Sequence, residues 1–262
     1  MNNHLGPAYM PHQQSVKLSS SIAALVIAAC EIAQVSAHSG VLSYSISGQT
    51  YNGFTPYNKP TGQTTIEHEW DSHNPITDPN HPSRDSVLWN GSLRFLISPV
   101  MVYMANCNGA CTTANTASLT WFKIDEAGLI SGNYNNGTWA QGELIANNNS
   151  WTSTIPASLV PGEYMIRHEL LAIHTPTQPQ FYPECAQLKI TVRNMALVPA
   201  NIFRSNTIGS NIQGSGTAQP PSSYLVKLPG ANQVSDPGVT LNVYSHPTWT
   251  NYTVPGPAVW RG

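Results

Sequence analysis

Charged residues are scarce in this chain. Only 9% of its 262 residues are charged, with 11 Lys and Arg against 13 Asp and Glu, for a formal net charge of -2. No cluster of Lys and Arg occurs, which argues against nucleic acid or an anionic membrane surface as a partner, because both require a basic patch. The polar surface must come from Ser, Thr, Asn and Gln. Such a neutral surface suits a neutral, hydroxyl-rich ligand such as a polysaccharide.

Long hydrophobic runs are also missing, apart from one near the start. The run from Ile22 to Cys30 is too short to cross the ~30 Å hydrocarbon core of a bilayer. It follows a lysine and precedes the small-residue sequence Val-Ser-Ala37, the pattern of a secretory signal peptide. Residues 1–37 are therefore predicted to be a signal peptide with an extended n-region, and the protein to be secreted and extracellular. Cleavage after Ala37 would make His38 the N-terminal residue.

The remaining residues, 38–262, have the pattern of a single all-β domain. Short apolar or alternating runs are separated by Gly, Pro and Asn clusters, and no sustained helical period occurs. This pattern favours an immunoglobulin/fibronectin-like antiparallel β-sandwich with long loops. The loop-rich stretch 194–240 could be a linker to a further module, but we expect a surface loop that folds back, and no separate carbohydrate-binding module. The expected strands lie within Gly40–Ile46, Thr64–Trp70, Pro99–Cys107, Ala117–Ile124, Gly162–Ile173 and Ala186–Val192.

Cysteines are few, and their number after cleavage is odd. Cys107, Cys111 and Cys185 remain, whereas an oxidising compartment favours an even number. Cys107 and Cys111 are close enough in sequence to form a disulfide across a tight loop. Cys185 would then have no cysteine to pair with. Four Asn-X-Ser/Thr sequons agree with secretion and predict glycosylation sites in loops; they begin at Asn90, Asn136, Asn148 and Asn251.

An N-terminal histidine is chemically special. The α-amine and ring Nδ1 of His38 can chelate one metal ion, and two neutral nitrogens with a near-planar bite suit Cu(II). The alternative is that a histidine merely happens to follow the cleavage site.

A longer motif near Arg167 favours the copper interpretation. The sequence contains Arg167-His168-Glu169, then Ile173-His174, then Gln-Phe-Tyr-Pro at 180–183, followed by Cys185. With this motif, nearly all of residues 38–260 resembles the fungal lytic polysaccharide monooxygenases of auxiliary activity family 9, once classed as glycoside hydrolases. The resemblance implies one copper ion and oxidative cleavage of β-1,4-glucan at C1 and/or C4, using O₂ or H₂O₂ and an external electron donor. It also implies a cellulose or other β-glucan surface as partner, and a monomer.

The resemblance assigns roles by position. His38 would supply two copper nitrogens, Tyr182 would take the axial position, and His168 and Gln180 would be hydrogen-bonding groups beside the metal. Gln180 and Tyr182 are two residues apart, so both face the same side of a strand. Tyr51 and Tyr252 are candidates for the flat face that stacks on sugar rings.

The chain departs from the family near residues 80–98. The family has a second copper histidine just before the strand at Pro99, but Leu96 or Ile97 stands there, and no histidine occurs between His81 and His168. A cysteine that would pair with Cys185 is missing too. One deletion or a mis-spliced gene model would explain these losses together.

Two other functions remain open. The first is a non-catalytic, secreted copper- or glycan-binding relative that has lost the second histidine of the copper site. The second is a hydrolase with paired carboxylates, although the thirteen acidic residues are scattered and form no motif that indicates such a pair.

Overall fold

The computed structural model describes residues 38–39, 41–54, 62–67, 89–90, 97–174, 178–192, 210–214 and 216–262. The chain divides into two units, Met1–Ser36 and Ala37–Gly262, and every described residue lies in the second. No helix among the described residues is long and apolar enough to cross a membrane.

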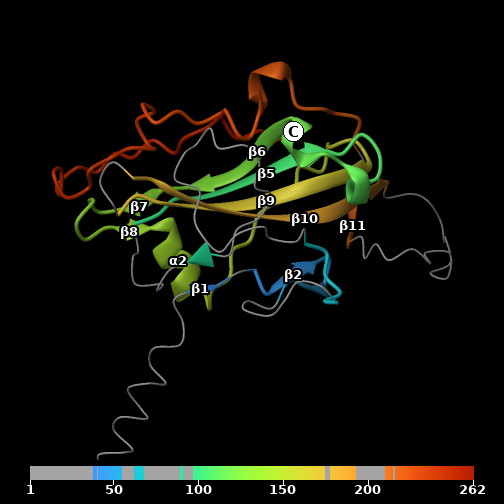
Figure 1. Ribbon diagram of the computed structural model, residues 1–262, viewed down its shortest axis with the longest axis horizontal. Helices are drawn as coiled ribbons and strands as arrows, with labels where there is room; N and C mark the ends of the chain where they lie inside the picture. Colours follow the sequence, from blue (N-terminus) through green and yellow to red (C-terminus); the bar gives the residue numbers. More distant parts are fainter. Residues whose placement is uncertain are drawn as a thin grey trace, which may run out of the picture. The chain divides into compact units, whose positions relative to one another are not determined.

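A six-stranded sheet forms the centre of the fold (Figure 1). Its neighbouring strands run antiparallel, except that β10 and β11 are parallel. Across the sheet the strands are β11 (Ser210–Gly214), β10 (Gln180–Val192), β9 (Gly162–Ala172), β5 (Val100–Asn106), β6 (Trp121–Ala127) and β12 (Leu225–Val226).

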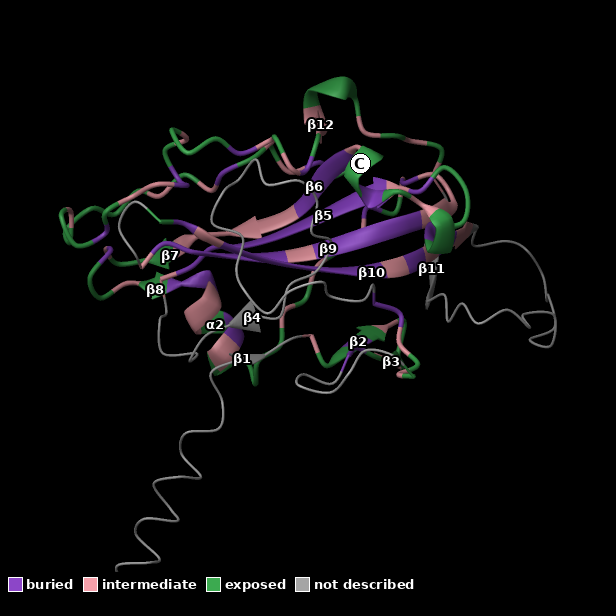
Figure 2. Ribbon diagram, in the orientation of Figure 1, coloured by how far each residue is buried: buried purple, intermediate pink, exposed green. Residues whose placement is uncertain are grey.

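Strand β5 is buried on both faces (Figure 2) because its sequence is continuously apolar. Alternate side chains serve two separate core clusters, as the two-residue period of a strand requires. Met101 and Tyr103 contribute to one cluster, whereas Val102 and Met104 contribute to the other. The predicted run Pro99–Cys107 is therefore confirmed as a central strand.

The N-terminal segment lies over one face of the sheet in short antiparallel pairs. Strand β1 (His38–Ser39) pairs with β4 (Trp89–Asn90), and β2 (Ser43–Ile46) pairs with β3 (Gln49–Asn52). Ser47 and Gly48 join β2 to β3 with φ of 51° and 79°. Two successive positive φ angles are the geometry of a tight hairpin turn.

Most of the C-terminal segment, residues 227–255, lies over the opposite face (Figure 1). Tyr224, Leu225 and Trp260 instead pack into the cluster that contains Tyr44, beside β6. Leu228, Val239 and Val243 from this segment are buried in the core cluster that contains Tyr103. The predicted fold-back of the loop-rich C-terminal part is therefore confirmed for these residues.

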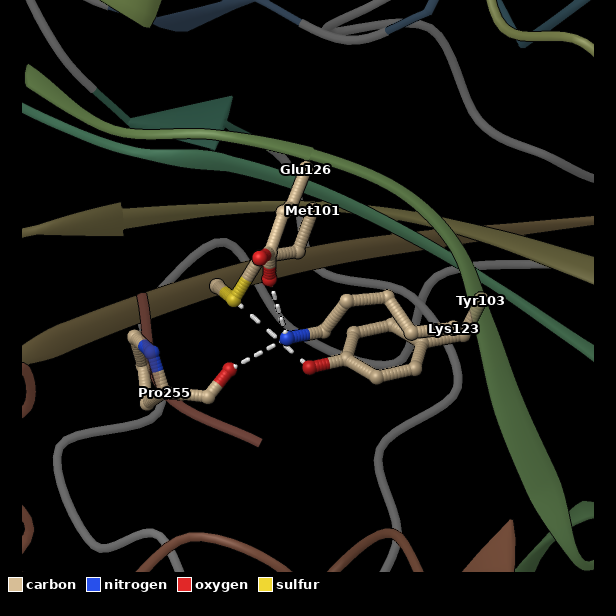
Figure 3. Close-up of polar contacts among 5 residues, drawn as sticks. All are labelled: Met101, Tyr103, Lys123, Glu126 and Pro255. Carbon is tan, nitrogen blue, oxygen red and sulfur yellow. Dashed lines mark hydrogen bonds and ion pairs between the residues drawn. The ribbon is translucent and has the colours of Figure 1, made fainter. Parts of the chain in front are cut away.

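One buried lysine fixes the end of this C-terminal segment (Figure 3). The Nζ atom of Lys123, on β6, donates to the carbonyl of Pro255 at 2.7 Å and forms an ion pair with Glu126 at 2.6 Å. It also lies 5.6 Å from the ring centroid of Tyr103. The backbone carbonyl of Lys123 accepts a hydrogen bond from the Trp260 N–H at 2.8 Å.

Three local features differ from the sequence-based expectation. Strand β6 begins at Trp121, because Thr116–Ser118 forms a 3-10 turn whose preceding Asn115 side chain accepts from the Ala117 N–H. A helix, α2 (Ala140–Ala146), follows the small hairpin of β7 (Leu129–Ser131) and β8 (Thr138–Trp139). In the expected strand Thr64–Trp70, the described part makes an isolated bridge at Glu67, and residues 68–70 lie outside the described residues.

Candidate active site

The first residues of β10 bring together two of the predicted site residues. The Tyr182 hydroxyl donates to Gln180 Oε1 at 2.8 Å, and both side chains lie on the same face of the strand because they are two residues apart. Tyr182 is 6% exposed, and burial raises its pKa to about 12. Its hydroxyl is therefore a neutral phenol at neutral pH.

The backbone of His38 lies on the same side of the sheet as this pair. His38 is paired with Asn90 in β1 and β4, and its side chain lies outside the described residues. Three residues later, the Val41 N–H donates to Glu184 Oε2 at 2.5 Å. Glu184 is on β10, two residues after Tyr182, so one strand carries both the tyrosine and the contact to the N-terminal segment.

His168 lies near Tyr182 in the strand register, two residues before Leu170, the β9 partner of Tyr182. It pairs across β9 and β10 with Glu184, whereas Gln180 pairs with Ala172, four residues further along β9. Its ring centroid lies 5.8 Å from that of Tyr44, and its Nδ1 is enclosed without a hydrogen-bond partner among the described residues. Burial lowers the pKa of His168 to about 4, so the ring is neutral.

His174 lies at the Gln180 end of the Gln180–Tyr182 pair in the strand register. It is two residues beyond Ala172, the partner of Gln180, and it is half-buried. Burial lowers its pKa, which keeps the ring neutral at neutral pH. No role was predicted for His174 from the sequence, although an apolar strand that ends in Ile173-His174 already placed it at a strand terminus.

Two buried carboxyl groups lie beside the N-terminal segment. Glu67 accepts from the Tyr44 hydroxyl at 2.8 Å and from the Phe54 N–H at 2.5 Å. Burial raises the pKa of Glu67 to about 7. Burial, and then the charge of Glu67, raise the pKa of Glu184 well above its ordinary value. The two acids therefore favour protonated forms rather than two adjacent negative charges.

The position expected for a second copper histidine is apolar where it is described. Ile97 packs against the core cluster that contains Tyr103, and its carbonyl accepts from the Ile173 N–H at 3.4 Å. Leu96 lies outside the described residues. Within the described ranges, no group of three His, Cys, Asp or Glu side chains could hold a metal. The described donor set therefore fits copper in part: it supplies a neutral tyrosine oxygen, and His38 would have to supply the nitrogens.

The predicted disulfide is confirmed. Cys107 and Cys111 are joined by an S–S bond of 1.99 Å, which closes the turn after β5. Cys185 is fully buried on β10 and takes no part in this bond. Its side chain packs in the core cluster that contains Tyr103.

Among the described residues, the most exposed aromatic rings differ from the two candidates. Tyr252 packs against Trp139 with ring centroids 5.0 Å apart, and its hydroxyl donates to the Gly238 carbonyl at 2.6 Å. Tyr51 is partly buried against the core. Tyr244 is 60% exposed and Trp249 is 49% exposed, although one face of the Trp249 ring is stacked on His246 with ring centroids 3.8 Å apart.

Comparison with known proteins identifies the class to which this fold and site belong. The family model of Auxiliary Activity family 9 (formerly GH61) matches residues 85–252. The AA9 family lytic polysaccharide monooxygenase B of Heterobasidion irregulare is 52% identical over 92% of this chain and 98% of its own length. The crystal structure of HiLPMO9B superposes with a TM-score of 0.71 at 53% identity, over 86% of this chain and 100% of that one.

A more distant structure agrees. The cellulose-active polysaccharide monooxygenase from M. thermophila (MtPMO3*) superposes with a TM-score of 0.66 at 33% identity, over 86% of this chain and 99% of that one. The chain therefore belongs to Auxiliary Activity family 9, the lytic polysaccharide monooxygenases, and the predicted immunoglobulin-like β-sandwich is confirmed.

Proposed function

We propose that this protein is a secreted, copper-dependent monooxygenase that cleaves β-1,4-glucan chains of cellulose oxidatively at C1 and/or C4. Family membership supports this activity, and the paired Gln180 and Tyr182 side chains on β10 are the observation that carries it. The amine and ring of His38, together with the Tyr182 oxygen, would hold one copper ion. Bound copper would supply the redox chemistry with O₂ or H₂O₂ and an external electron donor.

The side chains beside the proposed copper site would bind and orient the oxygen reactant. Tyr182 is held neutral, so its hydroxyl can remain bonded to Gln180 instead of binding metal as a phenolate. The bond to Oε1 fixes the orientation of the Gln180 amide, whose N–H groups would donate to an oxygen reactant. His168 was assigned a similar task by the resemblance. We propose that His174 shares it, because it lies nearer to Gln180 in the strand register.

Secretion is part of the same proposal. Removal of residues 1–37 would create the amine of His38, and residues 38–262 would be the whole functional domain, acting as a monomer. The sequon residues Asn136, Asn148 and Asn251 are exposed, as attachment of a glycan requires. The disulfide is also typical of an oxidising compartment.

Copper titration of the secreted protein, followed by electron paramagnetic resonance, tests the proposed site. Three equatorial nitrogens would support the enzyme, with a further histidine completing the set. Two or none would contradict it for this polypeptide. A chain with one extra residue before His38 is the matched control: its amine is displaced, so it should lose the two His38 nitrogens while keeping the fold.

One observation favours a second candidate, a non-catalytic copper- or glycan-binding relative. Ile97 is apolar and packed against the core where the family places its second histidine. Sequencing of the transcript and the genomic DNA between Pro79 and Pro99 separates the cases. If the genome encodes a skipped segment with a histidine and a cysteine, the natural protein has the complete site. If the genome encodes the same residues between Pro79 and Pro99 as this chain, the result supports the non-catalytic copper- or glycan-binding relative.

A further inference from the structure

Two buried glutamates hold opposite ends of one N-terminal hairpin. Glu184, on β10, accepts the Val41 N–H just before β2. Glu67 accepts the Phe54 N–H just after β3 and also binds the Tyr44 hydroxyl on β2 at 2.8 Å. Both acids are at most 9% exposed. Since buried carboxyl groups require partners, these contacts are specific attachments of the hairpin to the sheet.

The two attachments reach the sheet at neighbouring points. Glu67 forms a backbone bridge with Ala186, and the Gln187 N–H donates to the Ile66 carbonyl at 2.9 Å. Glu184 lies two residues before Ala186, on the same face of β10. The hairpin is therefore fastened along one short stretch of β10.

The hairpin ends also approach each other closely. The Gly53 N–H donates to the Leu42 carbonyl at 2.9 Å. A Cβ atom on Gly53 would lie 1.8 Å from the Val41 carbonyl oxygen and 3.0 Å from Glu67 Oε1. Only a glycine allows this approach, so Val41 has little freedom to shift away from Glu184.

This geometry sets where His38 can be. His38 is three residues before Val41, and three extended residues span at most about 10 Å. Tyr182 and Glu184 are two residues apart on one face of β10, about 7 Å along the strand. Fixing Val41 on Glu184 therefore keeps the N-terminal histidine within reach of Tyr182.

We propose that Glu184 is a positioning residue for His38, and that Glu67 supports it by holding the other end of the hairpin. Only the expected effect on copper affinity rests on the proposed function. The attachment itself is a property of the metal-free protein. Neither glutamate touches the reactants, since each acts through a backbone N–H.

The test compares Glu184→Leu with a matched control, Glu163→Leu, in the secreted, metal-free protein. Glu163 also accepts a backbone N–H, that of Cys111 at 3.1 Å, but it serves the disulfide turn. We expect Glu184→Leu to accelerate amide hydrogen exchange at Ser39 to Val41 about tenfold or more, the cost of one lost hydrogen bond to a carboxyl group. Glu163→Leu should leave exchange there unchanged, and Glu184→Gln, which keeps an acceptor oxygen, should remain near wild type.

Copper binding is the second measurement. We expect the dissociation constant for Cu(II) to rise about tenfold or more in Glu184→Leu, and less than about threefold in Glu184→Gln and Glu163→Leu. If Glu184→Leu does not fold, Val41→Pro removes the donor from the other side and should give the same increase.

The outcomes separate the two proposals. Unchanged exchange at Ser39 and Gly40 in both Glu184→Leu and Val41→Pro, which has no amide hydrogen at position 41, overturns the attachment. Faster exchange with unchanged copper affinity overturns the positioning of His38. If wild type binds no copper through His38, the proposed function and the positioning of a ligand both fail, while the exchange result still decides whether Glu184 holds the segment.

Discussion

The two faces of the central sheet hold their terminal segments by opposite kinds of hydrogen bond: a cationic donor on one face and carboxyl acceptors on the other. On one face, the buried cation of Lys123 binds the Pro255 carbonyl and is neutralised by Glu126. On the other, the two acids Glu67 and Glu184 bind backbone N–H groups of the N-terminal segment, without a described cation between them.

The difference concerns protonation. Glu126 is partly exposed and pairs with Lys123 directly, so the C-terminal anchor is a compensated ion pair. In the N-terminal anchor, burial raises the pKa of both acids, to about 7 for Glu67. The C-terminal anchor is thus held by a pair of opposite charges. The carboxyl groups of the N-terminal anchor, beside the proposed copper site, instead become protonated at a higher pH than ordinary carboxyl groups.

Removing the cation of the C-terminal anchor should have the largest effect. Lys123→Met leaves the Pro255 carbonyl and Glu126 without their donor, and we expect it to lower the free energy of unfolding by about 3 to 5 kcal/mol. Urea denaturation measures this change. Lys227→Met is the control, because Lys227 also donates to backbone carbonyls, those of Ser118 and Leu119, but is exposed. It should cost less than about 1 kcal/mol, and equal losses in the two variants would contradict the account.

Crowding the N-terminal anchor should have an intermediate effect. Gly53→Ala places a Cβ atom 1.8 Å from the Val41 carbonyl oxygen, and we expect a loss of about 2 kcal/mol in the free energy of unfolding because the backbone must move. Gly162→Ala serves as control, since its nearest atom would lie 3.4 Å away. Thermal unfolding of both variants gives the comparison, and a neutral Gly53→Ala would show that the hairpin ends are not fixed.

The smallest effect should come from pH and His168, on the N-terminal face. Its pKa is lowered from 6.5 to about 4 by burial, so the neutral ring is favoured in the folded state. The stability from this residue is complete above pH 6.5 and is lost as pH falls through 4.

For this partly exposed ring we expect wild type to lose on the order of 1 kcal/mol relative to His168→Gln between pH 7 and pH 4. Urea denaturation of both proteins at several pH values gives the difference, in which other titrating groups cancel. Parallel stability curves would mean that the ring is solvated in the folded state.

The sheet could be predicted well from sequence because its strands carry local signals. A continuous apolar run identified β5, and short runs bounded by Gly, Pro and Asn clusters identified β9 and the second half of β10. The helix α2 escaped because its seven residues bury only Ala140 and Leu144, too few for a periodic pattern to emerge.

The candidate site could be predicted in part. The two-residue spacing of Gln180 and Tyr182 correctly placed both on one face of a strand, where their side chains are hydrogen-bonded. The hydrogen bond between Val41 and Glu184 joins residues 143 positions apart, so no local pattern reports it. The register of β9 and β10 likewise decides that His174 lies closer than His168 to Gln180.

Product analysis on cellulose decides whether this protein cleaves the polymer by oxidation. The secreted protein, its N-terminus verified as His38, is loaded with copper and incubated with cellulose, O₂ and a chemical reductant, and the soluble fragments are identified by mass spectrometry. The account predicts oligosaccharides oxidised at C1 and/or C4, formed only when copper and reductant are both present. Fragments without oxidation, or no fragments from a copper-loaded protein that binds cellulose, would contradict it.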